Sequence, residues 1–308
     1  TSPRQQPVPR DHWLTVFCPS RSLKFLRQSH VYNIDMNPIS ELLSKVKTLF
    51  PKKVIGLALS GGATFGAAHV GVLQVLEENG IRPHLVAGTS AGALIGAAYC
   101  AGIPLSEIET LFRTMNWPTL LRLSIRNSLS IFDTQPMEEF LRKKIGDIEF
   151  QELRIPFAAV ACDIHTGARV ILDRGALAPA IRASAAIPGL FSPVEVNGRL
   201  LVDGGIVDNL PVEQVRDMGA RYVISSDVSH RGPNSKKPEN LFEIMLSMIY
   251  IMQSRAALPL EDASDCYIRP QVSQYSSWGF KDVPQVMEAG RKAARLVIPQ
   301  LRRQLRIR

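Results

Sequence analysis

Of the 308 residues of the chain, 45% are hydrophobic and 21% are charged, which is ordinary for a folded soluble protein. The length allows one large α/β domain or two small ones. The formal net charge of +8 suggests an anionic partner: a membrane surface, a nucleic acid or an acidic substrate. The four cysteines lie far apart without a C-x-x-C pair, which argues against a zinc site or a disulfide framework and favours a reducing, cytoplasmic location.

Residues 1–50 differ in composition from the rest of the chain. They combine several prolines with basic residues ahead of a predicted helix at Ile39–Leu49. We interpret them as an N-terminal extension or linker, and residues 51–308 as the main domain. No signal peptide is visible, and the start at Thr1 rather than Met is compatible with removal of an N-terminal segment.

From Lys53 onward, strand-like and helix-like stretches alternate. The predicted strands are 54–59, 83–87, 155–162, 168–172 and 222–228, with a hairpin at 194–202. The predicted helices are one that follows the loop 60–66 and ends near Asn79-Gly80, then 91–101, 104–115, 136–145, 177–186 and 241–258. This alternation predicts a three-layer α/β/α fold with a mostly parallel central sheet covered on both faces.

Two apolar stretches could be mistaken for membrane or lipid contacts. The run Leu85–Leu105 carries no charge, but it contains several glycines and divides into a strand and a helix, which predicts a buried sheet-helix unit rather than a membrane span. The helix 241–258 contains Met245, Met248 and Met252. We expect these methionines to belong to the core rather than to a lipid-binding stripe.

The most informative motif is Gly88-Thr89-Ser90-Ala91-Gly92, a G-x-S-x-G between a predicted strand and a predicted helix. A sharp turn at this place lifts the serine out of the sheet and directs it toward the first free amides of the helix. Gly88 and Gly92 remove side chains that would collide in such a turn. Ser90 is therefore the candidate nucleophile of an acyl-transfer site.

A nucleophile of this kind requires hydrogen-bond donors for the oxyanion, and the loop after the first strand could supply them. Gly61, Gly62 and Ala63 present consecutive backbone N–H groups ahead of a helix. The same loop could cradle a phosphate. However, it lacks both the ending of a P-loop and a clean G-x-G-x-x-G, so nucleotide binding is disfavoured.

The base that would activate Ser90 has two candidates. Asp203 follows a predicted strand and precedes two glycines, where it either acts as a base with a raised pKa or merely caps a turn. His230 would complete a Ser90–Asp203–His230 triad in α/β-hydrolase order, although its polar surroundings are more typical of an exposed residue. His69 and His165 are weaker candidates, and we expect His69 to be a packed structural residue.

The C-terminal stretch predicts an amphipathic basic helix. Its cations are Arg291, Lys292, Arg295, Arg302, Arg303, Arg306 and Arg308, with apolar residues interleaved at helical spacing. We favour docking of the apolar face on the domain over peripheral contact with an anionic membrane. Nucleic-acid binding has neither a fold motif nor interleaved aromatic residues in its support.

Taken together, these motifs resemble those of the patatin-like phospholipase family from about Val54 to Val228. The matching parts are the loop 60–66, Ala68-His69-Val70-Gly71-Val72-Leu73, the segment 88–92, Arg182-Ala183-Ser184-Ala185-Ala186-Ile187-Pro188, Asp203-Gly204-Gly205 and Asn209-Leu210-Pro211. The stretch before Val54 is faintly similar to bacterial relatives of neuropathy target esterase. In those relatives a cyclic-nucleotide-binding domain can lie upstream; this chain shows no such domain.

The resemblance implies a Ser90–Asp203 dyad without histidine that hydrolyses ester bonds of phospholipids, lysophospholipids or related acyl lipids. It implies that Ser90 attacks the carbonyl and that Asp203 accepts its proton and later activates water. Neither a metal nor an organic cofactor is implied. The sequence gives no prediction of an oligomeric state.

The loop departs from the family pattern, which usually reads Gly-Gly-Gly-x-Arg/Lys-Gly. Ala63 replaces the third glycine and can still donate its N–H if its φ angle is negative, whereas Phe65 replaces a cation that could steady the loop or attract a phosphate. The alternatives to a hydrolase are therefore a weak or inactive lipid-binding regulatory module, and an acyltransferase that uses the same acyl-enzyme.

Overall fold

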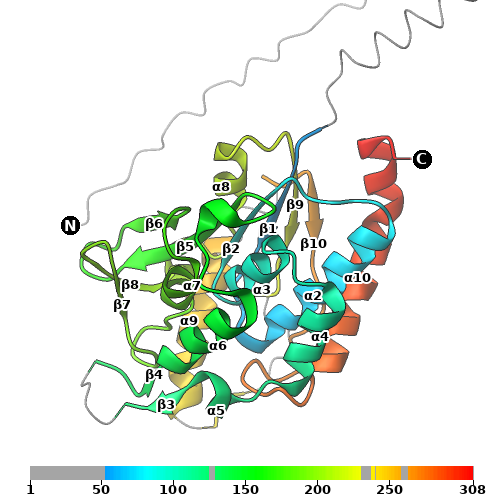
Figure 1. The fold of residues 1–308 in the computed structure, drawn as a ribbon. Helices are drawn as coiled ribbons and strands as arrows, with labels where there is room; N and C mark the ends of the chain where they lie inside the picture. Colours follow the sequence, from blue (N-terminus) through cyan, green and yellow to red (C-terminus); the bar gives the residue numbers. More distant parts are fainter. Residues whose placement is uncertain (1–52, 125–128, 230–236, 240, 258–262, 308) are drawn as a thin grey trace, which may run out of the picture. The chain divides into compact units, whose positions relative to one another are not determined.

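The computed structural model describes residues 53–124, 129–229, 237–239, 241–257 and 263–307 (Figure 1). The predicted N-terminal extension with its helix at Ile39–Leu49 lies outside the described residues, and so does His230.

An eight-stranded sheet forms the centre of the described domain. Its order is β10-β9-β1-β2-β5-β8-β7, with β6 also paired to β5. The first five strands of that order are mutually parallel, whereas β6 and β8 run antiparallel to β5 and β7 runs antiparallel to β8. The strands are β1 (Ile55–Leu59), β2 (Leu85–Thr89), β5 (Phe157–Asp163), β6 (Arg169–Leu172), β7 (Val194–Val196), β8 (Arg199–Asp203), β9 (Tyr222–Ser226) and β10 (Cys266–Ile268), and a separate small hairpin pairs β3 (Arg122–Leu123) with β4 (Phe132–Asp133).

Helices follow most strands, as the alternating pattern predicts. They are α2 (Ala67–Glu78), α3 (Ala91–Cys100), α4 (Leu105–Thr114), α5 (Trp117–Leu120), α6 (Gln135–Ile145), α7 (Leu177–Ser184), α8 (Val212–Asp217), α9 (Leu241–Ala257) and α10 (Val283–Leu305). Three short 3₁₀ turns are η1 (Ala63–Gly66), η2 (Phe150–Glu152) and η3 (Gly204–Ile206).

Strand β1 shows how the sheet separates two apolar layers. Successive side chains of a strand point to opposite faces, so Leu57 and Leu59 enter the larger core while Ala58 enters a smaller one beneath α8. Gly56 faces α8 as well, and a Cβ there would overlap Val215. The sheet is therefore buried on both faces, which confirms the predicted three-layer α/β/α architecture with a mostly parallel sheet.

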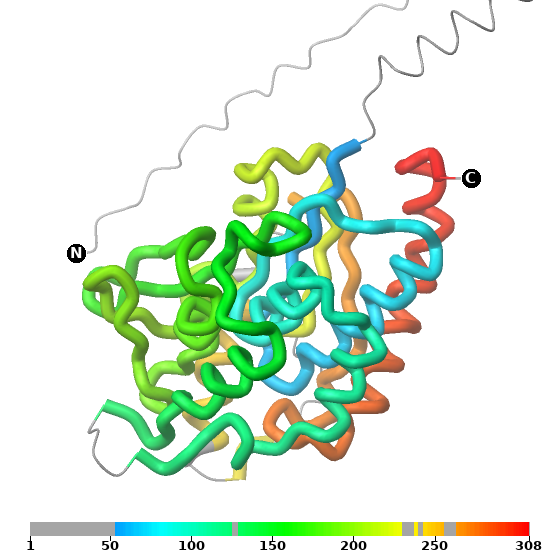
Figure 2. Tube along the Cα trace, viewed as in Figure 1, coloured from blue at the N-terminus to red at the C-terminus, as the bar shows by residue number. Residues whose placement is uncertain are grey.

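Helix α10 packs along α2, and α4 lies beside both (Figures 1 and 2). Glycines bring the first two helices together, since a Cβ on Gly71 would overlap the carbonyl oxygen of Met287 and one on Gly290 that of Ala68. Met287 and Leu301 of α10 are fully buried. Docking of the apolar face is thus confirmed; contact between the basic face and a membrane stays a prediction.

Two methionines of α9 are more exposed than the sequence led us to expect. Met248 and Met252 are 60% and 47% exposed, so the prediction that they belong to the core is wrong. The helix is apolar around most of its circumference, and its buried face is formed by other residues, including Leu246 and Ile249. Among the described helices, none is both long enough and apolar enough to span a bilayer.

Candidate active site

Ser90 lies at the junction between β2 and α3, with φ 53° and ψ −118°. A serine at positive φ is strained, and such strain persists only where the surrounding structure fixes the backbone. Here the Ser90 N–H donates to the Ser184 hydroxyl at 3.0 Å, and that hydroxyl donates in turn to the carbonyl oxygen of Val160 at 2.6 Å. Ser184 therefore holds the turn that presents Ser90.

The two glycines of the motif allow the helix to start directly above the sheet. A Cβ on Gly92 would overlap the carbonyl oxygen of Leu59 and would lie 2.6 Å from that of Ser60. A Cβ on Gly88 would lie 2.7 Å from the backbone nitrogen of Ala93. These close approaches explain in physical terms why glycines flank Ser90.

Asp203 is the last residue of β8 and is fully buried. Its backbone N–H donates to the Ala186 carbonyl oxygen at 2.8 Å, and its Oδ1 accepts the N–H of Gly205 at 2.8 Å. Asp203 thus caps η3, as one of the two readings of the sequence expected, but this accounts for only one of its carboxylate oxygens.

Burial raises the pKa of Asp203 to about 6, although hydrogen bonding from the Ser90 side chain and the Gly205 N–H acts to lower it. No hydrogen bond of ordinary geometry reaches Asp203 Oδ2 from any described residue. The structure thus brings the side chains of Ser90 and Asp203 together, and Oδ1 is the carboxylate oxygen that the Gly205 N–H occupies. A carboxylate with a pKa near 6 is well suited to act as a general base near neutral pH.

The loop 61–63 contributes fewer free amides than the sequence suggested. The N–H of Gly61 donates to the carbonyl oxygen of Asn209 at 3.1 Å, so it is already committed. The amides of Gly62 and Ala63 donate to no described residue. The loop is held from its other side by Thr64, whose N–H and hydroxyl donate to the carbonyl oxygens of Ser277 and Ser276.

Ala63 has a φ of 49°, so the expected negative φ at this residue is wrong. Its N–H nevertheless donates to no described residue, so it stays a candidate donor in a strained backbone conformation. We predict that Ala63→Gly, which removes the left-handed strain, keeps the esterase kcat within about threefold of wild type. We predict that Ala63→Val lowers kcat by about 10²-fold, because a β-branched residue disfavours this conformation and would move the N–H group that the sequence predicts as an oxyanion donor. Steady-state hydrolysis of a soluble ester measures both. Equal activity of the valine and glycine variants would contradict a role for this amide.

His69 and His165 differ in burial. His69 is fully buried, and burial lowers its pKa to about 4. Its Nε2 lies 3.0 Å from the Ser60 carbonyl oxygen, and its Nδ1 lies 2.8 Å from the Ser226 hydroxyl oxygen. This confirms that His69 is a packed structural residue. His165 is exposed in the turn between β5 and β6.

No cluster of three or more His, Cys, Asp or Glu side chains able to hold a metal occurs within the described ranges.

An apolar pocket opens beside Ser90. Side chains from α3, α4, α6 and the segment after α7 line it, together with Ala63 and Ser90 themselves, and they include Leu94, Phe112, Met137, Ile187 and Phe191. An apolar chain attached to a carbonyl at Ser90 would find a matching environment here.

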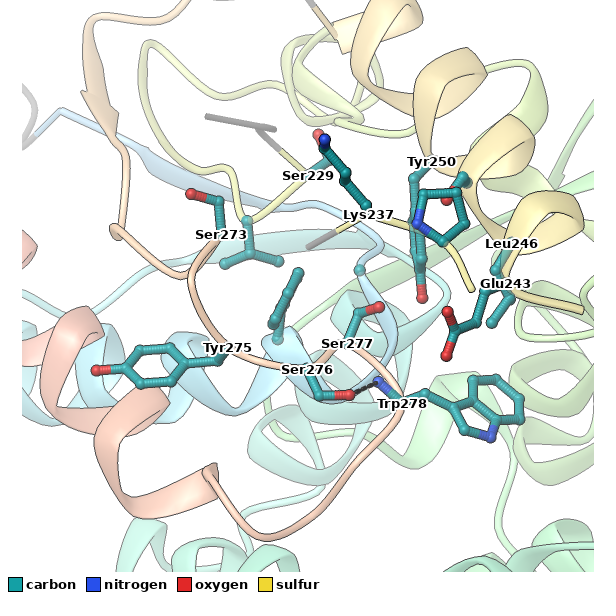
Figure 3. Close-up of a pocket in the computed structure, with 15 residues that line it drawn as sticks. Ser229, Lys237, Glu243, Leu246, Tyr250, Ser273, Tyr275, Ser276, Ser277 and Trp278 are labelled. Atoms are coloured by element: carbon teal, nitrogen blue, oxygen red, sulfur yellow. Dashed lines mark hydrogen bonds between the residues drawn. The ribbon is translucent and has the colours of Figure 1, made fainter. Parts of the chain in front are cut away.

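A second pocket, lined by both polar and apolar side chains, includes Gly62 of the glycine loop. Figure 3 shows Glu243 and Tyr250 of α9 on one side and Ser276 and Ser277 on the other. Trp278 belongs to this pocket and stacks on Trp117 of the apolar pocket, with ring centroids 4.2 Å apart. The two pockets are thus separated by the loop and this aromatic pair.

Two residues that position the site were not assigned a role from the sequence. Ser184 lies within the motif at 182–188, and its contact with Ser90 joins residues 94 positions apart. Asn209 binds the glycine loop through its carbonyl oxygen and through its side chain, whose Nδ2 donates weakly to Gly61 O at 3.5 Å. The only indication in the sequence that these two residues matter is that both lie in motifs that resemble the patatin-like phospholipase family.

Comparison with known proteins identifies the family of the chain. The family model for patatin-like phospholipase matches residues 57–216, more than half of the chain. An uncharacterized NTE family protein of Mycobacterium bovis is 39% identical over 184 residues, which are 58% of this chain and 51% of the relative. Lysophospholipase NTE1 of Saccharomyces cerevisiae is 25% identical over 322 residues, 91% of this chain and 18% of the relative.

The chain therefore spans about half the length of the mycobacterial relative and less than a fifth of the yeast one. Among solved structures, VipD from Legionella pneumophila is similar in fold, with a TM-score of 0.53, 15% identity, and coverage of 81% of this chain and 67% of that chain. On the family match, which includes the loop 60–66 and Ser90, the chain belongs to the patatin-like phospholipase family.

Proposed function

We propose that this domain is a serine hydrolase of acyl lipids that uses Ser90 as nucleophile, Asp203 as base and an acyl-enzyme intermediate. The observation that carries the proposal is the pairing of a strained, buried serine, which lines an apolar pocket, with a fully buried carboxylate of raised pKa. Family membership makes a lipid ester the expected substrate, and the yeast relative is named as a lysophospholipase.

In the proposed reaction, Ser90 Oγ attacks the ester carbonyl while Asp203 accepts its proton. The free amides of Gly62 and Ala63 and the N-terminal end of α3 stabilise the oxyanion. The leaving alcohol then takes the proton from Asp203, and water releases the acyl group in the second half of the reaction. The acyl chain would occupy the apolar pocket, and the second pocket, whose lining at Gly62 also offers Ser229, Ser276 and Ser277, would accept the leaving alcohol.

The test is a panel of phospholipids, lysophospholipids and neutral acyl lipids, with released fatty acid measured by mass spectrometry. We expect hydrolysis by wild type, and a loss of at least about 10⁴-fold in Ser90→Ala. A wild type that hydrolyses none of them but binds lipid vesicles would indicate a regulatory lipid-binding module. Ester product that rises with added alcohol at the expense of free acid would indicate an acyltransferase.

The pKa of Asp203 gives a pH prediction. A base must be ionised to accept the serine proton, so kcat/KM should rise with pH through an apparent pKa of about 6 and then level off. Hydrolysis of a soluble ester from about pH 4 to pH 8 measures this limb. A limb centred near the ordinary carboxyl value, about 4, would contradict the proposed environment of Asp203.

Membrane contact and location are proposed on separate grounds. The exposed cations of α10, including Lys292 and Arg295, would attract anionic lipid, and we place the protein in the cytoplasm with peripheral access to a membrane. Co-sedimentation with vesicles that contain or lack anionic lipid tests this. Binding that is independent of vesicle charge would argue against a role for α10.

A further inference from the structure

Two stretches of the domain expose large apolar side chains to solvent. In the segment from β3 to β4, Leu123 is 68% exposed, Leu129 is 59% exposed, and Ile131 is exposed as well. Helix α9 exposes four apolar side chains, whose spacing places them on one face of the helix: Ile244, Met248, Ile251 and Met252. Single exposed apolar side chains are normal on protein surfaces, but a group of this size indicates a contact surface.

A short segment after α7 joins these two stretches. Phe132 of β4 donates its N–H to the carbonyl oxygen of Leu190 at 2.8 Å and accepts the N–H of Ser192 at 3.0 Å. The same segment contacts α9, because a Cβ on Gly189 would lie 3.8 Å from Met245 Cε. The hairpin and the first half of α9 therefore lie against one segment. We call their exposed side chains the apolar rim: Leu123, Leu129, Ile131, Ile244 and Met248.

The apolar rim adjoins the apolar pocket beside Ser90. Trp117 and Leu120 of α5 line this pocket, and a single residue separates the end of α5 from the start of β3. Phe191 lines the same pocket and forms a β-bridge with Phe132 of β4. Figure 1 shows α5, β3 and β4 together at the lower end of the domain. The rim thus leads, along the chain and through this bridge, to the walls of the pocket.

The charges near the apolar rim match a lipid surface. From Asn116 to Phe132 the sequence contains two arginines and no acidic residue. Asp133, which follows directly, forms an ion pair with Arg122 at 2.6 Å. Glu243, the acidic residue of α9, lines the second pocket (Figure 3). Cations beside exposed apolar side chains complement lipid phosphate groups, while the apolar side chains can enter the acyl layer.

We propose that the apolar rim docks the domain on a lipid surface, with its side chains among the acyl chains, so that a lipid reaches the apolar pocket without crossing water. Docking itself needs no catalysis, whereas delivery to the pocket rests on the proposed function. The contact differs from the electrostatic one proposed for α10, because apolar insertion does not require an anionic surface. Met248, which the sequence assigned to the core, would belong to this lipid-binding surface.

The first experiment measures docking in the absence of turnover. In a Ser90→Ala background, the full chain is co-sedimented with vesicles of zwitterionic phosphatidylcholine. We expect Leu123→Ser combined with Leu129→Ser to lower the partition coefficient by about 10- to 100-fold, since two exposed leucines no longer enter the acyl layer. The matched control is Leu296→Ser on α10, a leucine that is 82% exposed and lies outside the rim. This control should bind within about twofold of the parent protein.

The second experiment separates docking from chemistry, with Ser90 intact. The paired Leu123 and Leu129 substitutions should lower hydrolysis of vesicle lipid by about 10- to 100-fold and leave hydrolysis of a soluble p-nitrophenyl ester within about twofold of wild type. Ile244→Ser combined with Met248→Ser tests the contribution of α9 and should change the two activities in the same directions. Equal losses on both substrates would indicate a damaged active site and would contradict docking by the rim.

Three further results would overturn the proposal. One is unchanged vesicle binding in both rim variants, and another is an equal loss of binding in Leu296→Ser. The third is a dimer, measured by light scattering, that the rim substitutions dissociate, because a second copy of the chain would then cover this surface. The proposed function fails separately: a wild type that binds vesicles through the rim but hydrolyses no ester would retain docking and contradict catalysis.

Discussion

Asp203→Asn is expected to lower the esterase kcat by about 10³- to 10⁴-fold while leaving the protein folded. The amide has the same shape as the carboxyl group and can still accept the N–H of Gly205, but it cannot take the proton of Ser90. Steady-state kinetics with a soluble ester measures the loss, and circular dichroism checks the fold.

The matched comparison is His230→Ala, which tests the alternative triad. We expect this variant to retain wild-type kcat and the same acid limb near pH 6. An inactive His230→Ala together with an active Asp203→Asn would replace the dyad with histidine catalysis.

The same Asp203 substitution should stabilise the protein at neutral and alkaline pH. The folded-state pKa of about 6 lies above the ordinary value of 3.8, so ionisation of Asp203 destabilises the folded state as pH rises through 6. Asp203→Asn removes this cost, which amounts to up to about 3 kcal/mol above pH 7. Denaturant unfolding at about pH 8 and pH 4 should show a gain that disappears at the lower pH. An equal gain at both would contradict the pKa assignment.

Gly92→Ala is expected to have the second large effect. Its methyl group would overlap the carbonyl oxygen of Leu59 and lie 2.6 Å from that of Ser60, and both are backbone atoms that cannot rotate away. We expect a loss of about 3 kcal/mol or more in the free energy of unfolding, and displacement of Ser90 from its productive position with a loss of at least about 10²-fold in kcat. Denaturant unfolding and ester hydrolysis measure the two effects.

Gly279→Ala is the matched control, because its nearest neighbour would be Ser276 Oγ at 3.5 Å, an ordinary contact. It should lie within about 1 kcal/mol of wild type in stability. If both variants behave alike, close packing of α3 on β1 is not what holds the turn at Ser90.

Contiguous motifs made much of the site predictable from the sequence. The strand, the turn at Ser90 and the helix follow one another directly within residues 85–100. Strand β1 and the glycine loop are likewise contiguous in the sequence. Asp203 was harder, because a carboxylate before two glycines can also cap a turn; in the structure it caps η3 and also lies near Ser90.

The features that could not be predicted depend on contacts between distant segments. Ala63 has its positive φ next to Thr64, which bonds to Ser276 and Ser277 more than two hundred residues away. The apolar rim forms only because the β3–β4 hairpin and α9 lie against the same segment after α7. Strand β10 and helix α8 are too short for a hydrophobic period to reveal them.

Helix α9 illustrates another limit. A helix that is apolar on nearly all sides does not indicate which side is buried, so the exposure of Met248 and Met252 had to come from the structure. Helix α10, by contrast, has a clear polar face, and its docking on the domain was predicted correctly.

The most direct test of the central claim is labelling with a fluorophosphonate, which reacts covalently only with an activated serine. Peptide mapping by mass spectrometry should locate the adduct at Ser90 in wild type. Labelling should be absent in Ser90→Ala and slowed by at least about 10²-fold in Asp203→Asn. An adduct at another serine, or equal labelling of wild type and Asp203→Asn, would contradict activation of Ser90 by Asp203.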